Sequence, residues 1–494
     1  MKHHTIGILI CFLGPFTLYL LTLAPVVQSF DSAELTVGAY ALGFVHPPGY
    51  PLYMLLGYLF AQVPIGNIAL RLNLMSAIFG VLTTAVLYEV IFRQTRHTLT
   101  SVTASLFFST MPIFWSQSIR AEVYTLHTFL VTSSLLTWMY AHQSRRKDVL
   151  AVCFFLLGLG MSHHPTTALL WASILLCGMF EDHYWRKSIL LLTPVGSIIM
   201  GACYIAYVIW RSATTTVDYI RPYFGVEPGS LAGLWWLISA QAFHCLFRFD
   251  FNPPAILHEV FRLILMIWDN SLGIGMILAI WGCKASQRRN PSWNRLLSLY
   301  FLANVIAFFL YHAVDKEVMF IPVFTVGNIW VASGITELVV WFEKSYRKIG
   351  QRFTRHLPNI VLLAIIGIGV GINWSTLNLR NNRRAYTFAI QLLDEVPPAT
   401  IIVNHWVTAS VIDYVQLVDG KRPDVMSFNL DFYFLGLQKH CDALYETVSQ
   451  RLWFNWLQEH MQQRPLCFLE PLPPIPSGFQ WVKQGLCWTL IASE

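Results

Sequence analysis

Long apolar runs separated by short charged clusters constrain this chain more than any other feature. Of its 494 residues, 55% are hydrophobic and only 12% are charged. Soluble domains carry about 25% charged residues, and an apolar run of about 18 residues or more can cross a bilayer as a helix. We therefore predict an α-helical polytopic membrane protein with about eleven transmembrane helices. We expect the spans at 5–26, 67–92, 98–114, 121–142, 148–162, 165–180, 187–210, 256–283, 295–313, 318–342 and 357–374.

The basic residues indicate the orientation of these spans. One set of alternate loops contains sixteen lysines and arginines, whereas the other set contains five. Because loops rich in Lys and Arg stay in the cytoplasm, we expect a cytoplasmic N-terminus and an extracytoplasmic tail after residue 374. The chain ends in Ile-Ala-Ser-Glu and has no ER-retention signal, so we expect a bacterial plasma membrane.

Two domains follow from this pattern. Residues 1–374 form a transmembrane domain with outer loops at 27–66 and 211–255, and we expect 50–62 to lie at the outer interface as a short helix. Residues 375–494 have ordinary soluble composition and alternate helical and strand patterns, which predicts a small α/β domain. The nine cysteines form no CxxC pair, and one disulfide could form among the three in this tail.

An acidic pair stands at the start of the first outer loop. Asp31 and Glu34 would share one face of a helix, and a carboxylate near a low-dielectric boundary can act as a general base. The same residues also fit a capping box, with Asp31 as N-cap and Glu34 at the third helical position. The local pattern leaves both interpretations open.

Two histidine motifs could contribute to a site. The sequence His-Pro-Pro-Gly-Tyr-Pro predicts a rigid turn that could hold His46 or Tyr50 near a substrate, although it also suits a plain helix start. His163 and His164 would point apart on a helix, so a contact with phosphate is more plausible than a metal site. The alternative is that they are interfacial residues at a helix end.

Further charged or polar residues lie at the predicted outer ends of spans. Glu122 and Tyr124 begin the fourth span, and Glu317 lies in a short outer turn. Each could be a functional residue, or its side chain could simply reach solvent at the membrane surface. Arg211 and Arg221 could bind phosphate, because a guanidinium matches phosphate oxygens, although either could be a simple surface residue. Nucleotide-binding glycine motifs are absent from the sequence.

The run from Leu23 to Leu35, followed by Ala41 to Tyr53, closely resembles the opening of the membrane protein O-mannosyltransferase family. This family includes a human enzyme that acts on plexin and receptor-kinase ectodomains, together with bacterial homologues. Shorter stretches also resemble it, namely Trp115 to Tyr124, the two histidines before Pro165, and Pro398 to Asn404 with Arg422 to Val425. The resemblance implies a GT-C fold and chemistry on the outer face, with Asp31 as base and Glu34 as its partner.

The expected function is therefore that of an inverting glycosyltransferase. A sugar, with mannose implied by the family, would move from a polyprenyl-phosphate donor to an acceptor hydroxyl of protein Ser or Thr, or of a glycan. We expect His163, His164, Arg211 and Arg221 to stabilise the leaving lipid phosphate. We expect no metal, cofactor or nucleic-acid partner. The alternatives are a transporter or flippase of lipid-linked sugar, which would require ionisable residues near mid-span and broken helices, and a membrane scaffold.

Overall fold

The structure, a computed structural model, describes residues 2–247, 252–313, 315–345, 351–437, 445–461, 463–472, 475 and 477–492. The chain forms two compact units. Unit 1 comprises Met1–Leu23, Asn73–Ile205 and Leu246–Arg380, and unit 2 comprises Ala24–Leu72, Ala206–Cys245 and Asn381–Glu494. Each unit is thus assembled from three separate stretches of sequence. The predicted domain boundary between residues 374 and 375 stays a prediction.

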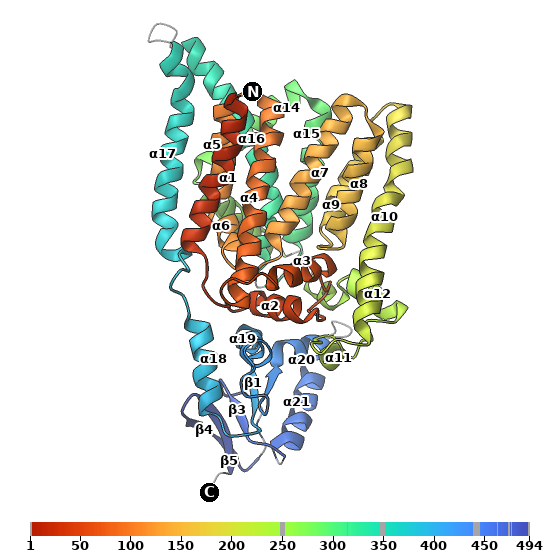
Figure 1. Ribbon diagram of the computed structural model, residues 1–494, viewed down its shortest axis with the longest axis vertical. Coiled ribbons are helices and arrows are strands. Elements are labelled where there is room, and N and C mark those ends of the chain that lie inside the picture. The colour runs from red at the N-terminus through yellow and green to blue at the C-terminus, as the bar shows by residue number, and fades with distance from the viewer. Residues whose placement is uncertain are drawn as a thin grey trace. The chain divides into compact units, whose positions relative to one another are not determined.

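Unit 1 is helical, and its long helices run side by side (Figure 1). The long and short helices of this unit are α1 (Lys2–Thr22), α4 (Ile68–Thr95, shared with unit 2), α5 (Thr98–Ser109), α6 (Pro112–Ser118), α7 (Tyr124–Ser144), α8 (Lys147–Met161), α9 (Thr167–Gly178), α10 (His183–Ser212, also shared), η1 (Gln241–Leu246, also shared), α13 (Pro253–Asn270), α14 (Ile274–Arg289), α15 (Pro291–Phe309), η2 (Lys316–Phe320), α16 (Ile321–Ser345) and α17 (Gln351–Leu377).

The helical, multi-pass architecture predicted from the sequence is confirmed. Among the described residues, five helical segments are long and apolar enough to span a membrane, or six if one bent pair counts as a single span. The other predicted spans coincide with shorter or more polar helices, namely α5, α7, α8, α9 and α15. The total of about eleven spans stays a prediction.

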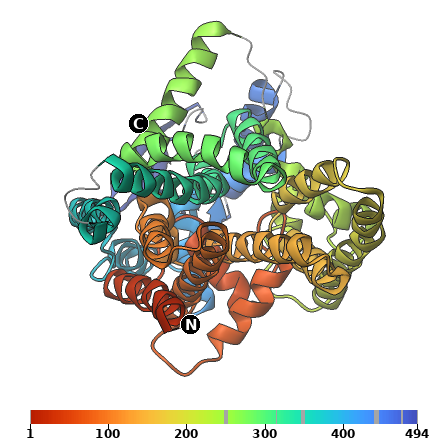
Figure 2. The ribbon, with the colours of Figure 1, turned by 90° about the horizontal axis from the view of Figure 1, so that it is seen from above.

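The prediction of one continuous helix over 256–283 is wrong. The segment is two helices, α13 and α14, which meet at an angle of 100° (Figure 2). Leu272 and Gly273 at the break have φ angles of 50° and 65°, in the left-handed region that no right-handed helix can continue through. Asp269, Asn270 and Ser271 directly precede the break and Gly273 lies in it, which is a turn signal that the prediction of one span passed over.

Unit 2 combines short helices with a small sheet. Its helices are α2 (Asp31–Ala41), α3 (Pro51–Ala61), α11 (Arg221–Phe224), α12 (Leu231–Ile238), α18 (Arg384–Glu395), α19 (Trp406–Leu417), α20 (Leu430–Leu437) and α21 (Tyr445–Met461). Its strands are β1 (Ile401–Asn404), β2 (Met426–Asn429), β3 (Leu466–Phe468), β4 (Phe479–Gln484) and β5 (Cys487–Ala492). The predicted α/β character of the tail and the helix expected at 50–62 are both observed.

The sheet has the strand order β2-β1-β3-β5-β4. Strand β1 pairs in parallel with β2 and β3, whereas β5 is antiparallel to β3 and β4. A disulfide between Cys467 and Cys487 links β3 to β5, so the disulfide considered for the tail is present. The carboxyl ends of β1, β2 and β3 meet at one edge, because parallel strands end on the same side of a sheet.

The first outer loop is anchored by the last turns of α10 and by the loop that follows this helix. The Tyr207 hydroxyl donates to the carbonyl of Gly43 (2.7 Å), and the guanidinium of Arg211 donates to the carbonyls of Leu42 and Ala41 at the end of α2. Phe44 exchanges backbone hydrogen bonds with Val217 and Tyr219 on either side of a parallel bridge to Asp218. These contacts fix where the segment after α2 turns toward α3, which lies beside α2 (Figure 1).

Gly43 is required at this bridge. A Cβ atom there would stand 2.7 Å from both the Cβ and the carbonyl oxygen of Val217, which is too close for any side chain. We expect Gly43→Ala to lower the free energy of unfolding by about 1–3 kcal/mol. A thermal melt of purified protein in detergent measures this. Gly201→Ala is the matched control, because nothing lies within 4 Å of a Cβ at that position. Equal melting temperatures for the two variants would contradict the prediction.

Candidate functional site

The acidic pair lies in the first turn of α2. The N-cap of this helix is Phe30, whose φ is 64°, and no side-chain hydrogen bond caps it. Asp31 is therefore the first helical residue, and the capping-box interpretation is wrong. The reason is tertiary, because both carboxylates hydrogen-bond to residues outside the helix. A non-glycine residue in the left-handed region costs about 1–3 kcal/mol and is often found beside a functional site.

His46 connects the two carboxylates. Its ring Nδ1 contacts Glu34 Oε2 in a short hydrogen bond, and its backbone N–H donates to Glu34 Oε1 at 2.6 Å. On the other side of the ring, Nε2 lies 3.9 Å from Asp31 Oδ2. The Glu34 side chain is fully buried, whereas that of Asp31 is 25% exposed. Of these two carboxylates, only Asp31 therefore has exposed surface, whereas Glu34 contacts the imidazole from inside the protein.

The rigid turn predicted around His46 brings Tyr50 to the same place. The Tyr50 hydroxyl lies 3.0 Å from His46 Nε2. The Pro47-Pro48 bond is cis, Gly49 has a φ of 79°, and Tyr50 itself has a φ of 45° directly before Pro51 starts α3. The turn thus folds back so that a residue four positions after the histidine contacts its ring. Asp31, Glu34, His46 and Tyr50 form one cluster.

Sequence reasoning missed the residues of the tail that complete this cluster. The Trp406 indole N–H donates to Asp31 Oδ1 at 2.9 Å, and the Trp406 ring stacks on Phe432. A partly buried pair lies nearby, in which the hydroxyl of Tyr219, from the second outer loop, donates to Asp413 Oδ2 at 2.9 Å. All of these residues lie far from Asp31 in the chain. No local pattern marks them.

Burial dominates the electrostatics of the cluster. It raises the pKa of Glu34, while the charge and hydrogen bonds of His46 oppose the rise. It also raises the pKa of Asp413 to about 7, because the hydrogen bond from Tyr219 offsets only part of the desolvation and the nearby Glu34 adds repulsion. Two carboxyl groups with raised pKa values beside a more exposed aspartate are typical of a site that handles protons.

Asp31, Glu34 and His46 also meet the geometric requirement for holding a cation. Each offers one ligand atom, and these atoms lie within 4.8 Å of one another. The chemistry of the set argues against a resident metal, however. The His46 imidazole and the Glu34 carboxylate already satisfy each other, and a cation would have to break their hydrogen bonds.

The second group of predicted residues lies in unit 1. His163 Nε2 lies 2.8 Å from the carbonyl oxygen of Val123, and the His164 ring lies 6.0 Å from that of Tyr124. His127, which sequence reasoning missed, packs 4.9 Å from the His164 ring. Glu122 pairs with Arg120 at 3.3 Å. The two predicted histidines and the start of α7 are thus brought together.

The predicted arginines are engaged with protein groups. Arg211 donates to two carbonyls at the end of α2, and Arg221 forms ion pairs with Asp218 (2.6 Å) and Glu227 (2.7 Å). Neither arrangement supports the expectation that these guanidiniums bind phosphate. Arg248, the third arginine of the outer loop predicted at 211–255 and also a candidate for phosphate binding, lies outside the described residues. Glu317 contacts Arg262 at 3.5 Å in unit 1, and its side chain is 59% exposed.

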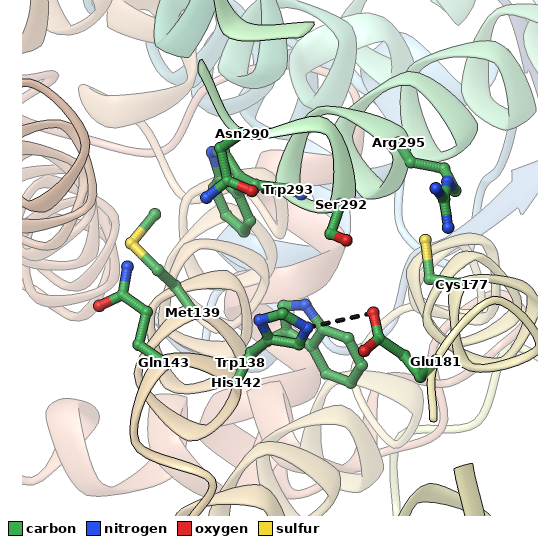
Figure 3. A pocket seen from close by; sticks show the side chains of 10 residues that line it. All are labelled: Trp138, Met139, His142, Gln143, Cys177, Glu181, Asn290, Ser292, Trp293 and Arg295. Carbon is green, nitrogen blue, oxygen red and sulfur yellow. Dashed lines mark hydrogen bonds and ion pairs between the residues drawn. The ribbon is translucent and has the colours of Figure 1, made fainter. Parts of the chain in front are cut away.

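Unit 1 also contains a small polar cavity near the start of α15. It has a volume of about 20 Å³, and Figure 3 shows the His142–Glu181 contact (3.1 Å) on its wall. Its lining residues are Trp138, Met139, His142, Gln143, Cys177, Glu181, Asn290, Ser292, Trp293 and Arg295. This volume holds about one water molecule. We therefore do not place sugar transfer in this cavity.

Residues 31–188 match the family described as "Protein O-mannosyl-transferase TMEM260 N-terminal domain". The resemblance seen in the sequence is confirmed. The chain is 26% identical to the mouse protein O-mannosyl-transferase TMEM260 over 462 residues, which cover 85% of this chain and 62% of the mouse protein. It is 21% identical to the Dictyostelium discoideum protein O-mannosyl-transferase tmem260, over 86% of this chain and 57% of that protein. It therefore spans about three-fifths of the length of these relatives.

Solved structures share the fold. ArnT from Cupriavidus metallidurans bound to undecaprenyl phosphate superimposes with a TM-score of 0.59 at 11% identity, over 99% of this chain and 97% of ArnT. The Archaeoglobus fulgidus oligosaccharyltransferase, tethered with an acceptor peptide, gives a TM-score of 0.55 at 13% identity, over 87% of this chain and 64% of that chain. The predicted GT-C fold of a multi-pass membrane protein is confirmed.

The raised pKa of Asp413 predicts a dependence of stability on pH. Between pH 3.8, the ordinary value, and about 7, the folded protein keeps this carboxyl protonated while the unfolded chain ionises it. The unfolded state then binds fewer protons, so the free energy of unfolding falls as pH rises through this range. We expect Asp413→Asn, which can still accept from Tyr219, to be more stable than the wild type at pH 8 by about 2–4 kcal/mol. The difference should vanish at pH 4 or below.

Thermal melts of both proteins across pH 4–8 test this. Asp394→Asn, at an exposed position of the same unit, is the control and should follow the wild type at every pH. A gap between Asp413→Asn and the wild type that does not change with pH would show that Asp413 does not titrate in this range.

A second prediction concerns metal. Because His46 and Glu34 already satisfy each other, we expect sugar transfer to be unchanged after exhaustive treatment with EDTA and removal of the chelate. The measurement is the initial rate of transfer before and after chelation, with added Mg²⁺ and Mn²⁺ as separate arms. A loss on chelation that either ion restores would assign a cation to this cluster.

Proposed function

We propose that this chain is an inverting glycosyltransferase that moves a sugar, mannose in the first instance, from a polyprenyl-phosphate donor to an acceptor hydroxyl. The observation that carries the proposal is the different exposure of two carboxylates that lie on either side of one imidazole. Asp31 is partly exposed and faces His46 Nε2, whereas Glu34 is buried and holds the opposite side of the ring. A reactive carboxylate supported by an oriented neighbour is the arrangement that general-base catalysis requires.

In the proposed reaction, Asp31 accepts the proton of the acceptor hydroxyl. The oxygen attacks the anomeric carbon and forms the new glycosidic bond. The bond from that carbon to the phosphate oxygen breaks on the opposite face, and the lipid phosphate leaves with the electron pair. Attack and departure on opposite faces invert the anomeric centre. Deprotonating the nucleophile contributes about 10²- to 10⁴-fold to such a reaction.

The relatives support this substrate class. Two are named protein O-mannosyl-transferases, ArnT was solved with undecaprenyl phosphate, and the oligosaccharyltransferase was solved with an acceptor peptide. We infer that Ser or Thr of a protein is the acceptor. The transporter alternative gains no support from these transferases. We further propose that the site faces the extracytoplasmic side, as the basic loops indicate. A bacterial plasma membrane stays a prediction, and both named O-mannosyl-transferases are eukaryotic.

The decisive experiment measures transfer from synthetic polyprenyl-phosphate mannose to Ser/Thr peptides by the purified protein. We expect Asp31→Asn to lower kcat by about 10²- to 10⁴-fold, because the amide cannot accept the proton. Glu34→Gln should lower it by about 10-fold or more, because the His46 ring loses its charged partner. Asp394→Asn, which is exposed, is the control and should keep full activity.

Two outcomes would contradict the proposal. Equal turnover by the wild type and Asp31→Asn would mean that the base is elsewhere. Failure of the folded wild type with polyprenyl-phosphate mannose, arabinose and hexosamine donors alike would contradict the transferase itself.

A further inference from the structure

We propose that Trp406, in the C-terminal α/β part of unit 2, is a positioning residue that fixes the Asp31 carboxylate in its reactive orientation. The inference rests on the proposed function, because it concerns the orientation of the proposed base. It assigns the tail a direct role in the reaction, in addition to any recognition of the acceptor.

The contact itself has the chemistry that a positioned base needs. The indole N–H donates to Asp31 Oδ1 at 2.9 Å, while Oδ2 is the oxygen on the His46 side. An indole can only donate, so it bonds well to a carboxylate but offers nothing to the proton of a carboxylic acid. A hydrogen bond to an ionised group is about twice as strong as a neutral one. Trp406 therefore binds one of the two oxygens of Asp31 and leaves the other on the His46 side.

The indole is held by its neighbours on several sides. It stacks on the Phe432 ring with centroids 4.3 Å apart and planes at 27°. The rings of His46 and Tyr219 meet it edge-to-face, each with a centroid distance of 6.2 Å. Such packing restricts the side chain to one rotamer, so the direction of the N–H bond is set before any substrate binds.

A second contact ties the same helix to the residue before the base. One turn after Trp406, the Ser410 hydroxyl donates to the carbonyl of Phe30 at 3.1 Å. Phe30 is the left-handed residue that directs Asp31 into α2. Helix α19 thus contacts both the backbone immediately before Asp31 and one oxygen of its carboxylate. Two contacts fix the orientation of the Asp31 carboxylate relative to α19, whereas a single hydrogen bond would let the carboxylate rotate.

The start of α19 is fixed to the sheet in turn. His405 follows β1, and its two ring nitrogens lie 2.8 Å from Asp431 after β2 and 2.8 Å from Glu470 after β3. The hydrogen bonds that the ring donates to Asp431 and Glu470 raise the pKa of His405 to about 9, so it stays protonated at neutral pH. The backbone N–H of Trp406 also donates to Asp431. The carboxyl edge of three parallel strands therefore sets where the indole begins.

The sharpest test replaces one atom. Substituting 3-benzothienylalanine for Trp406 keeps the bicyclic shape and the stacking but has sulfur in place of the N–H. We expect kcat for sugar transfer to fall by about 10- to 100-fold, since a hydrogen bond to a charged group is lost. KM for the lipid donor should change by less than about 2-fold, since binding is not affected.

Two further variants separate positioning from folding. Trp406→Phe should show the same loss of kcat, with a further loss of thermal stability from the reduced stacking. Trp453→Phe is the matched control, because Trp453 is buried in the core of the same sheet. It should lower the melting temperature but leave kcat and the KM for the lipid donor unchanged.

The outcomes distinguish this inference from the proposed function. If the benzothienylalanine protein turns over like the wild type, Trp406 only packs against Asp31, and the inference is overturned while the transferase stands. If Trp453→Phe lowers kcat as much as the benzothienylalanine substitution does, the loss is structural and the inference is again overturned. If the folded wild type transfers no sugar from any donor, the proposed function fails, and the role of Trp406 fails with it.

Discussion

The buried hydrogen bonds between Glu34 and His46 are the interaction on which the rest of the site depends. A carboxylate with no exposed surface is stable only if its oxygens are hydrogen-bonded, since an unpaired buried charge costs several kcal/mol. Both oxygens find partners in one residue, the backbone N–H and the ring of His46. The loop after α2 must therefore fold back over the first turn of that helix. Once it has done so, His46, Tyr50 and Asp31 are close together without further adjustment.

The same interaction separates the roles of two otherwise similar acids. Asp31 and Glu34 lie on one face of one helical turn, yet only Asp31 remains partly exposed. The two proposed roles are complementary. The buried Glu34 would hold the His46 ring in place, and a fixed ring would in turn hold the position of the accessible Asp31 carboxylate. The spacing of the two acids in the sequence does not predict which of them is exposed. Their exposure differs because the loop that carries His46 covers Glu34 and leaves part of Asp31 uncovered.

The sequence predicted what depends on local pattern and missed what depends on distant contacts. The acidic helix, the rigid turn at His46 and the α/β tail follow from short-range signals, and all were predicted close to their observed places. The capping box was a reasonable but wrong interpretation, since the residues that cap a helix are also those that accept distant hydrogen bonds. The break at Leu272 has a short turn signal, Asp269 to Gly273, that the long apolar flanks outweighed. Trp406 has no local feature that relates it to Asp31.

The assembly of unit 2 from three distant stretches has a consequence for function. The proposed catalytic pair comes from the first stretch, its anchoring bridge from the second and the indole on Asp31 from the third. Contacts between residues so far apart in sequence form only after the intervening chain has been ordered, since closing long loops costs entropy that later contacts must offset. We therefore expect the proposed base to be oriented last. A chain whose tail has not folded would present the acidic helix without the indole that binds one oxygen of Asp31.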